Sequence, residues 1–148
     1  METKIPPPIV TLAFGLSIYF SRGMFPAVEV WHSFYLGVFL LFIGFFILIS
    51  AVRLFKKDKT TVNPLNPDQA TKLVTDGIFK YSRNPMYLGM AVVLSSIAVF
   101  FNLLGGIILI ALFCAYITRF QIIPEERAMR DLFSDDFDKY IKETRRWV

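Results

Sequence analysis

Residues 31–55 read WHSFYLGVFLLFIGFFILISAVRLF, and Arg53 is the only formally charged side chain in that run. A helix rises about 1.5 Å per residue and needs about 20 apolar residues to cross a bilayer. The run is long enough to do so, and Arg53 lies near its end, where a long side chain reaches the polar boundary. This stretch therefore predicts a transmembrane helix around which the rest of the fold is arranged.

The composition of the whole chain also favours lipid as its surroundings. Of the 148 residues, 55% are hydrophobic, 19% are charged and 16 are phenylalanine, and the mean hydropathy is +0.52. Soluble domains usually have about a quarter of their residues charged. The length allows one domain, which we expect to occupy residues 1–148.

Three further apolar runs predict additional membrane helices, at residues 9–21, 86–101 and 104–121. The last two are separated by a segment that contains Asn102, Gly105 and Gly106, which are turn-forming residues. We therefore expect a tight helical hairpin there. The sequence as a whole predicts an all-α polytopic membrane protein with about four transmembrane helices.

The positive charges predict the orientation of these helices. With four spans, both termini lie on one side, and 15 of the 16 Lys and Arg residues fall on that side, because Arg22 alone falls opposite. Positively charged loops favour the cytoplasm. We expect both termini to be cytoplasmic, in a multi-pass protein of a prokaryotic plasma membrane.

The C-terminal segment predicts an amphipathic helix on the cytoplasmic side. Pro124 followed by Glu125 and Glu126 is typical of a helix start, and apolar residues recur from Met129 onwards with helical spacing. Ser134 is a candidate for a break between two shorter helices. From the residues alone, Glu125 is explained first by favourable charge at a helix N-terminus, and alternatively by binding of a cationic or ribose-bearing ligand.

Most common catalytic and metal-binding patterns are missing. The chain has one histidine and one cysteine, which argues against a zinc site, and we expect no bound metal. It has no Walker lysine motif and no G-x-S-x-G or G-x-G-x-x-G pattern. The positive charge is explained by membrane orientation, so we expect no nucleic-acid partner.

Two separated motifs carry a family resemblance. The first motif, residues 73–89, reads LVTDGIFKYSRNPMYLG, and the second motif, residues 125–140, contains Glu125-Glu126, Phe133-Ser134, Phe137 and Tyr140. Together, across an apolar hairpin, they resemble the integral-membrane methyltransferases. These are the isoprenylcysteine carboxyl methyltransferases and the phospholipid (phosphatidylethanolamine-type) methyltransferases. The resemblance covers about residues 30–147.

The resemblance implies a site for S-adenosyl-L-methionine (SAM) formed by both motifs. By position, residues 71–74 are implied to line the adenosine pocket, largely through backbone groups, and Phe79 to supply an aromatic face. Residues 84–87 match the cofactor-contacting tetrad of the family, and Glu125 matches its cofactor-holding acid. The implied cofactor residues are Thr71, Lys72, Leu73, Val74, Phe79, Asn84, Pro85, Met86, Tyr87 and Glu125.

Three positions depart from the isoprenylcysteine enzymes. Asn84 stands where their tetrad begins with histidine, and Ser134 stands where the pattern has glycine. Their substrate-contacting arginine aligns with Gln121, and the nearest arginine is Arg119. We take Arg119 and Gln121 as the candidate catalytic residues on the acceptor side. The Arg-Asn-Pro-Met-Tyr version of the motif looks more like the broad prokaryotic branch, whose acceptors are diverse.

The function implied is SAM-dependent methyl transfer to a small lipophilic acceptor, either a lipid or a prenyl-type molecule, at the cytoplasmic membrane face. Two alternatives belong to other classes. One is an NADPH-dependent enzyme similar to the membrane steroid reductases, and the other is a non-enzymatic membrane protein that keeps the fold. Binding of NADPH without SAM would favour the first, and binding of neither would favour the second.

Overall fold

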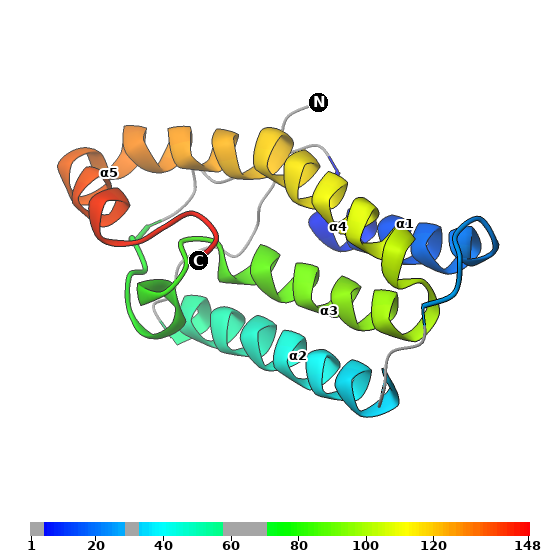
Figure 1. Cartoon of the computed structure of the whole chain (residues 1–148). Coiled ribbons are helices and arrows are strands. Elements are labelled where there is room, and N and C mark those ends of the chain that lie inside the picture. Colours follow the sequence, from blue (N-terminus) through cyan, green and yellow to red (C-terminus); the bar gives the residue numbers. More distant parts are fainter. Residues whose placement is uncertain (1–4, 29–32, 58–70) are drawn as a thin grey trace.

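The structure is a computed structural model that describes residues 5–28, 33–57 and 71–148 (Figure 1). All regular elements within these ranges are helical. In chain order they are α1 (Pro7–Phe20), η1 (Ser21–Gly23), α2 (Ser33–Lys57), η3 (Gly77–Lys80), α3 (Pro85–Phe101), α4 (Leu103–Ile117), the π-helical turn η4 (Thr118–Ile122) and α5 (Ile123–Glu143). The all-α expectation is confirmed for this part of the chain.

Helix α2 corresponds to the apolar run at residues 31–55, although Trp31 and His32 lie outside the described residues. By length and apolar composition, Ser33–Lys57 and the continuous helix Leu103–Glu143 could each cross a membrane. Pro85–Phe101 is apolar but shorter. The described residues thus contain two candidate membrane-spanning helices, and four spans with cytoplasmic termini stay a prediction.

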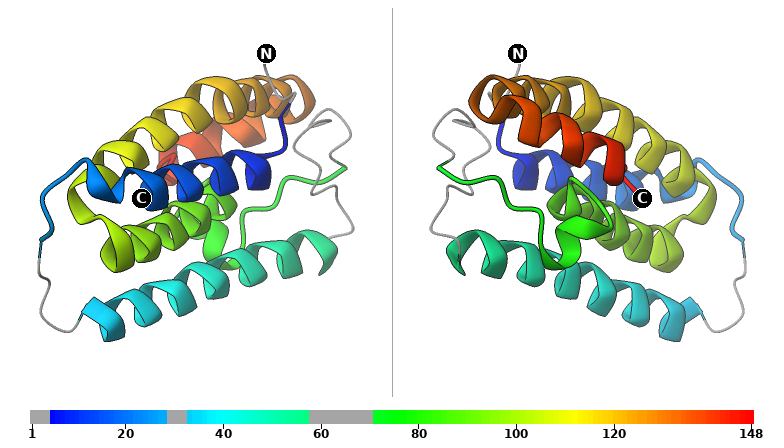
Figure 2. Two further views of the ribbon diagram at one scale, coloured as in Figure 1. Left: turned by 90° about the vertical axis from the view of Figure 1, so that its right-hand side faces the viewer. Right: turned by 90° about the vertical axis from the view of Figure 1, so that its left-hand side faces the viewer.

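Helices α2 and α3 lie side by side along their length (Figure 2). Glycines allow the close approach: a Cβ atom added to Gly44 would lie 2.7 Å from Val93 Cγ2 and 3.0 Å from the Gly89 carbonyl oxygen. The Ser96 hydroxyl donates a hydrogen bond of 2.7 Å to the Gly37 carbonyl. Small residues and serine hydroxyls are the usual means of joining helices in lipid. The other side of α2 exposes phenylalanines such as Phe42, which suits a lipid-facing surface.

The hairpin between α3 and α4 is tighter than we expected. Helix α3 ends at Phe101 and α4 begins at Leu103, so Asn102 alone connects them. Its side-chain oxygen accepts a hydrogen bond of 3.0 Å from the Gly105 N–H and caps α4. Our placement of Gly105 and Gly106 in the turn was wrong, because both lie in the first turns of α4. A Cβ atom on Gly106 would lie 2.2 Å from Ala98 Cβ, so glycine serves close packing there.

Helix α5 changes direction at Ser134, which has φ 40° and ψ −113° inside the helix. The residues after Ser134 fold back toward the segment that precedes α3 (Figures 1 and 2). Phe137 and Tyr140 are buried there against Val74, Phe79 and Ala51. The expected division at Ser134 is confirmed. The buried residues just named form a second hydrophobic core, which brings the end of α5 to residues 74–79.

Candidate functional site

The start of α3 and the start of α5 meet through one side-chain pair. The Tyr87 hydroxyl donates a hydrogen bond to Glu125 Oε1. Pro85 occupies the first position of α3, where a backbone N–H has no partner within the helix, so the missing N–H of proline costs nothing. Its fixed φ angle sets the entry of the chain into the helix. Tyr87 is 6% exposed and belongs to the core between α1, α3 and α4. The structure therefore brings one residue of each motif into direct contact.

Glu125 lies in an environment that disfavours a lone negative charge. Burial raises the pKa of its carboxyl to about 8, the hydrogen bond from Tyr87 acts in the opposite direction, and the neighbouring charge of Glu126 raises it further. A buried acid of this kind ionises readily only when a positive group lies beside it. Perturbed acids of this type are frequent at functional sites.

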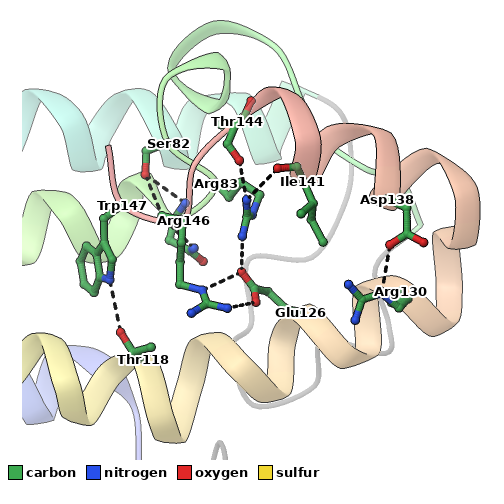
Figure 3. Close-up of polar contacts among 11 residues, drawn as sticks. Ser82, Arg83, Thr118, Glu126, Arg130, Asp138, Ile141, Thr144, Arg146 and Trp147 are labelled. Atoms are coloured by element: carbon green, nitrogen blue, oxygen red, sulfur yellow. Dashed lines mark hydrogen bonds and ion pairs between the residues drawn. The ribbon is translucent and has the colours of Figure 1, made fainter.

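Glu126 has the opposite surroundings, because two arginines hold it. Arg83 Nη2 donates to Glu126 Oε1 at 2.8 Å, while Arg146 donates through Nε to Oε1 at 3.0 Å and through Nη2 to Oε2 at 2.6 Å (Figure 3). Burial favours the neutral acid, but these hydrogen bonds and charges outweigh it and lower the pKa of Glu126. The two adjacent acids are therefore different: Glu126 is neutralised by two arginines, whereas among the described residues the hydrogen-bond partner of Glu125 is the Tyr87 hydroxyl.

The segment before α3 is fixed by the last residues of the chain. The Arg83 N–H donates to the Arg145 carbonyl at 3.0 Å, and Asn84 Nδ2 donates to the Arg146 carbonyl at 2.9 Å. Arg83 Nη1 also donates to the Thr144 carbonyl. The amide nitrogen of Asn84 thus serves a backbone contact, in the position where the isoprenylcysteine enzymes have histidine.

The implied adenosine-side residues divide into two groups. Thr71 and Lys72 are exposed, and Leu73 is half-buried. Val74 and Phe79 are buried in the second core, where the Phe79 ring packs edge-on against Phe55 with ring centroids 5.1 Å apart. The Tyr140 hydroxyl donates to the Phe79 carbonyl at 2.6 Å, which ties this segment to α5. Pro85 is buried and Met86 is half-buried against the same core.

A model of the phospholipid methyltransferase family matches residues 32–136. The chain belongs to the phospholipid methyltransferase family. No curated protein and no solved structure gives a significant match. Membership, together with the apolar helices, makes this a membrane methyltransferase of a family that acts on lipids. The matched range contains both the Tyr87–Glu125 and the Arg83–Glu126 contacts, whereas Arg146 lies beyond it.

In this member of the phospholipid methyltransferase family, the two acceptor-side candidates lie on η4 but face differently. Gln121 is 1% exposed, and its Nε2 donates to the Ile5 carbonyl at 2.8 Å. Arg119 is exposed, with its guanidinium carbon 5.6 Å from the centre of the Phe120 ring. Their part in the reaction stays a prediction.

Sequence reasoning missed the contribution of the C-terminal residues. The carbonyls of Arg146 and Thr144 accept hydrogen bonds from Asn84 and Arg83 of the first motif, and Trp147 Nε1 donates to Thr118 Oγ1 at 3.2 Å. The only signal was a basic and aromatic end, Arg145-Arg146-Trp147, which membrane orientation explains equally well. Within the described ranges no group of three or more His, Cys, Asp or Glu side chains gathers, and the absence of a bound metal stays a prediction.

Proposed function

We propose that this protein transfers the methyl group of SAM to a small lipophilic acceptor, a lipid or prenyl-type molecule, at the cytoplasmic face of the membrane. The observation that carries the proposal is the contact between Tyr87 and Glu125, one from each motif. It forms a site where an apolar helix bundle adjoins a charged segment. A water-soluble methyl donor and a membrane-dissolved acceptor need such a boundary to meet.

The residues present fit a cationic cofactor. Among the described residues the hydrogen-bond partner of the Glu125 carboxyl is the Tyr87 hydroxyl and not a cation, and burial raises the pKa of this carboxyl to about 8. SAM carries positive charge, and it supplies an activated methyl group when bound. We expect Glu125 to hold it, the aromatic face of Tyr87 to add cation–π attraction of about 0.5–2 kcal/mol, and residues 71–74 to contact adenosine.

The chain's own contribution to methyl transfer is alignment and exclusion of water. An in-line displacement needs neither a metal nor a covalent enzyme intermediate. The Tyr87 hydrogen bond fixes the orientation of Glu125, and the buried core around Tyr87 keeps water away. The lipid-facing surface of α2 suits lateral entry of an apolar acceptor, with Arg119 and Gln121 as candidates to contact it.

Calorimetry on detergent-purified protein tests the cofactor site. We expect SAM and S-adenosylhomocysteine to bind, and Glu125→Gln and Tyr87→Phe each to weaken SAM binding, Glu125→Gln by about tenfold or more because a charged partner is lost. Tyr81→Phe and Glu143→Gln are matched controls, since both side chains are exposed, and should bind like the wild type. Unchanged affinity in both site variants would refute the assignment.

A radiolabelled methyl-transfer assay against membrane lipid extracts tests the reaction itself. We expect label from SAM to appear in an extractable lipid, and the labelled product to identify the acceptor atom as oxygen, nitrogen or sulfur. NADPH binding without SAM binding would instead support the reductase-like alternative.

A further inference from the structure

The last residues of the chain return across the candidate site. We call residues 144–147 the C-terminal strap. After α5 ends at Glu143, the strap runs beside residues 80–84, and Figure 3 shows Arg146, Thr144 and Trp147 pointing to three different partners. Thr144 Oγ1 donates to the Lys80 carbonyl at 3.4 Å, and Trp147 reaches Thr118 at the start of η4. The strap therefore bridges η3 and η4, which are distant from each other in sequence.

Arg146 makes the most directional of these contacts. Its guanidinium binds both oxygens of Glu126, at 3.0 and 2.6 Å, and the Glu126 side chain is only 15% exposed. A planar two-pronged pair fixes orientation as well as distance, which a lysine cannot reproduce. Arg83 holds the same carboxylate from the α3 side. Glu126 is thus clamped between the strap and the first motif.

The clamp belongs to a closed circuit of contacts. Glu126 adjoins Glu125 in the first turn of α5, and Glu125 accepts the hydrogen bond from Tyr87 in the first turn of α3. Asn84, the residue just before α3, donates to the Arg146 backbone carbonyl. Arg146 therefore contacts both ends of the circuit, one through its side chain and the other through its backbone, and it sets how the two helix starts face each other.

We propose that Arg146 is a positioning residue, which holds Glu126 so that the adjacent Glu125 carboxylate faces Tyr87 at the cofactor site. This inference rests on the proposed function of Glu125 as the cofactor-holding acid. Arg146 itself need not touch the cofactor. Loss of its side chain should weaken SAM binding by about tenfold, while loss of another basic residue of the strap should not.

A double-mutant cycle separates this role from general stability. SAM affinity is measured by calorimetry for the wild type, Arg146→Ala, Glu125→Gln and the double variant. If Arg146 acts through Glu125, its replacement costs about tenfold in the wild type and almost nothing once Glu125→Gln is present. Arg146→Lys should keep the charge but recover only part of the affinity. Arg145→Ala is the matched control, because the Arg145 side chain is exposed and its backbone carbonyl is retained.

A second measurement shows whether the strap is docked. In a Trp31→Phe background, Trp147 is the only tryptophan, so its fluorescence reports the strap directly. We expect Arg146→Ala to shift that emission to longer wavelength, as Trp147 leaves Thr118 for water, and Arg145→Ala to leave it unchanged.

Each outcome has one meaning. Wild-type affinity in Arg146→Ala, an equal loss in Arg145→Ala, or full additivity with Glu125→Gln would overturn the positioning role while leaving the proposed function intact. Absence of SAM binding to the wild-type chain would overturn the proposed function and the positioning role with it.

Discussion

The seam between α2 and α3 and the cluster around Glu126 join their helices by opposite means. In the seam, glycines remove side-chain volume so that backbones touch, and Gly44 faces Gly89 across the contact. In the cluster, Arg83 and Arg146 place full charges on one mostly buried carboxylate. The seam depends on shape and tolerates any residue that is small enough. The cluster depends on the presence of each partner, so it should fail abruptly when one is removed.

The largest expected effect is that of Glu126→Ala. Arg83, whose side chain is 9% exposed, would keep its charge without a carboxylate, and breaking a buried pair from one side costs about 3 kcal/mol in the free energy of unfolding. Denaturant unfolding of the detergent-solubilised protein measures it. The control is Arg130→Ala, which removes the exposed pair between Arg130 and Asp138 (3.0 Å) and should cost less than about 1 kcal/mol. Equal losses in the two variants would show that the buried pair contributes no more to stability than the exposed one.

The seam should respond to added volume by a smaller amount. Gly44→Ala places a methyl group 2.7 Å from Val93 Cγ2 and 3.0 Å from a backbone oxygen that cannot easily move, so we expect a loss of about 1–3 kcal/mol. Gly23→Ala is the control, because nothing lies within 4 Å of its added Cβ atom. Unfolding curves of both variants decide the matter, and a neutral Gly44→Ala would show that the helices can separate freely.

The affinity for SAM should depend on pH through Glu125. Since burial raises the pKa of Glu125 from 4.5 to about 8, its carboxyl is mostly protonated below pH 8 before a cation binds. Binding of SAM favours the ionised form, so affinity should rise by up to about tenfold per pH unit toward pH 8 and level off above it. Calorimetry between pH 6 and 9 measures the slope. In Glu125→Gln the slope should fall to that of the ligand alone, and an equal slope would show that Glu125 does not titrate on binding.

The smallest effect concerns the break in α5 that carries Phe137 and Tyr140 back to the first motif. Ser134 has a φ of 40°, a conformation that glycine adopts without steric cost. Ser134→Gly should therefore stabilise the fold by about 1 kcal/mol. Ser17 is an exposed residue within the regular helix α1, so Ser17→Gly should instead destabilise the fold by a few tenths to about 1 kcal/mol. Thermal unfolding compares the two, and a loss in Ser134→Gly would exclude backbone strain at this position.

The positions of the helices could be predicted from the sequence because each helix is marked by its own run of apolar residues. The run 9–21 became Pro7–Phe20, and the run 31–55 became Ser33–Lys57 within the described residues. Ser134 lies within the apolar stripe of the second motif, between Phe133 and Phe137, where a break in the helix was expected. The Tyr87–Glu125 pairing could be expected only from the family resemblance, since 38 positions separate the two residues.

The clamp on Glu126 was beyond sequence reasoning for a physical reason. Arg83 and Arg146 resemble every other basic residue of the polar segments, and nothing local marks which of them meets a buried acid. Their selection depends on how α5 folds back at Ser134 and where the strap then runs. Gln121 shows the same limit, because its partner, the Ile5 carbonyl, comes from the opposite end of the chain.

The π-helical turn η4 changes the direction in which side chains leave the continuous helix formed by α4 and α5. Such a turn holds one residue more than the matching α-helical turn, and each residue added to a helix rotates all that follow by about 100°. Side chains up to Ile117 keep the spacing of an apolar helix that suits lipid. Glu125 and Glu126 are rotated about the helix axis relative to that spacing, which directs them to α3. A sequence alignment that slips by one position within 118–122 would therefore compare side chains of different orientation. For this chain, the length of that turn therefore sets how the side chains of Arg119 and Gln121 are directed.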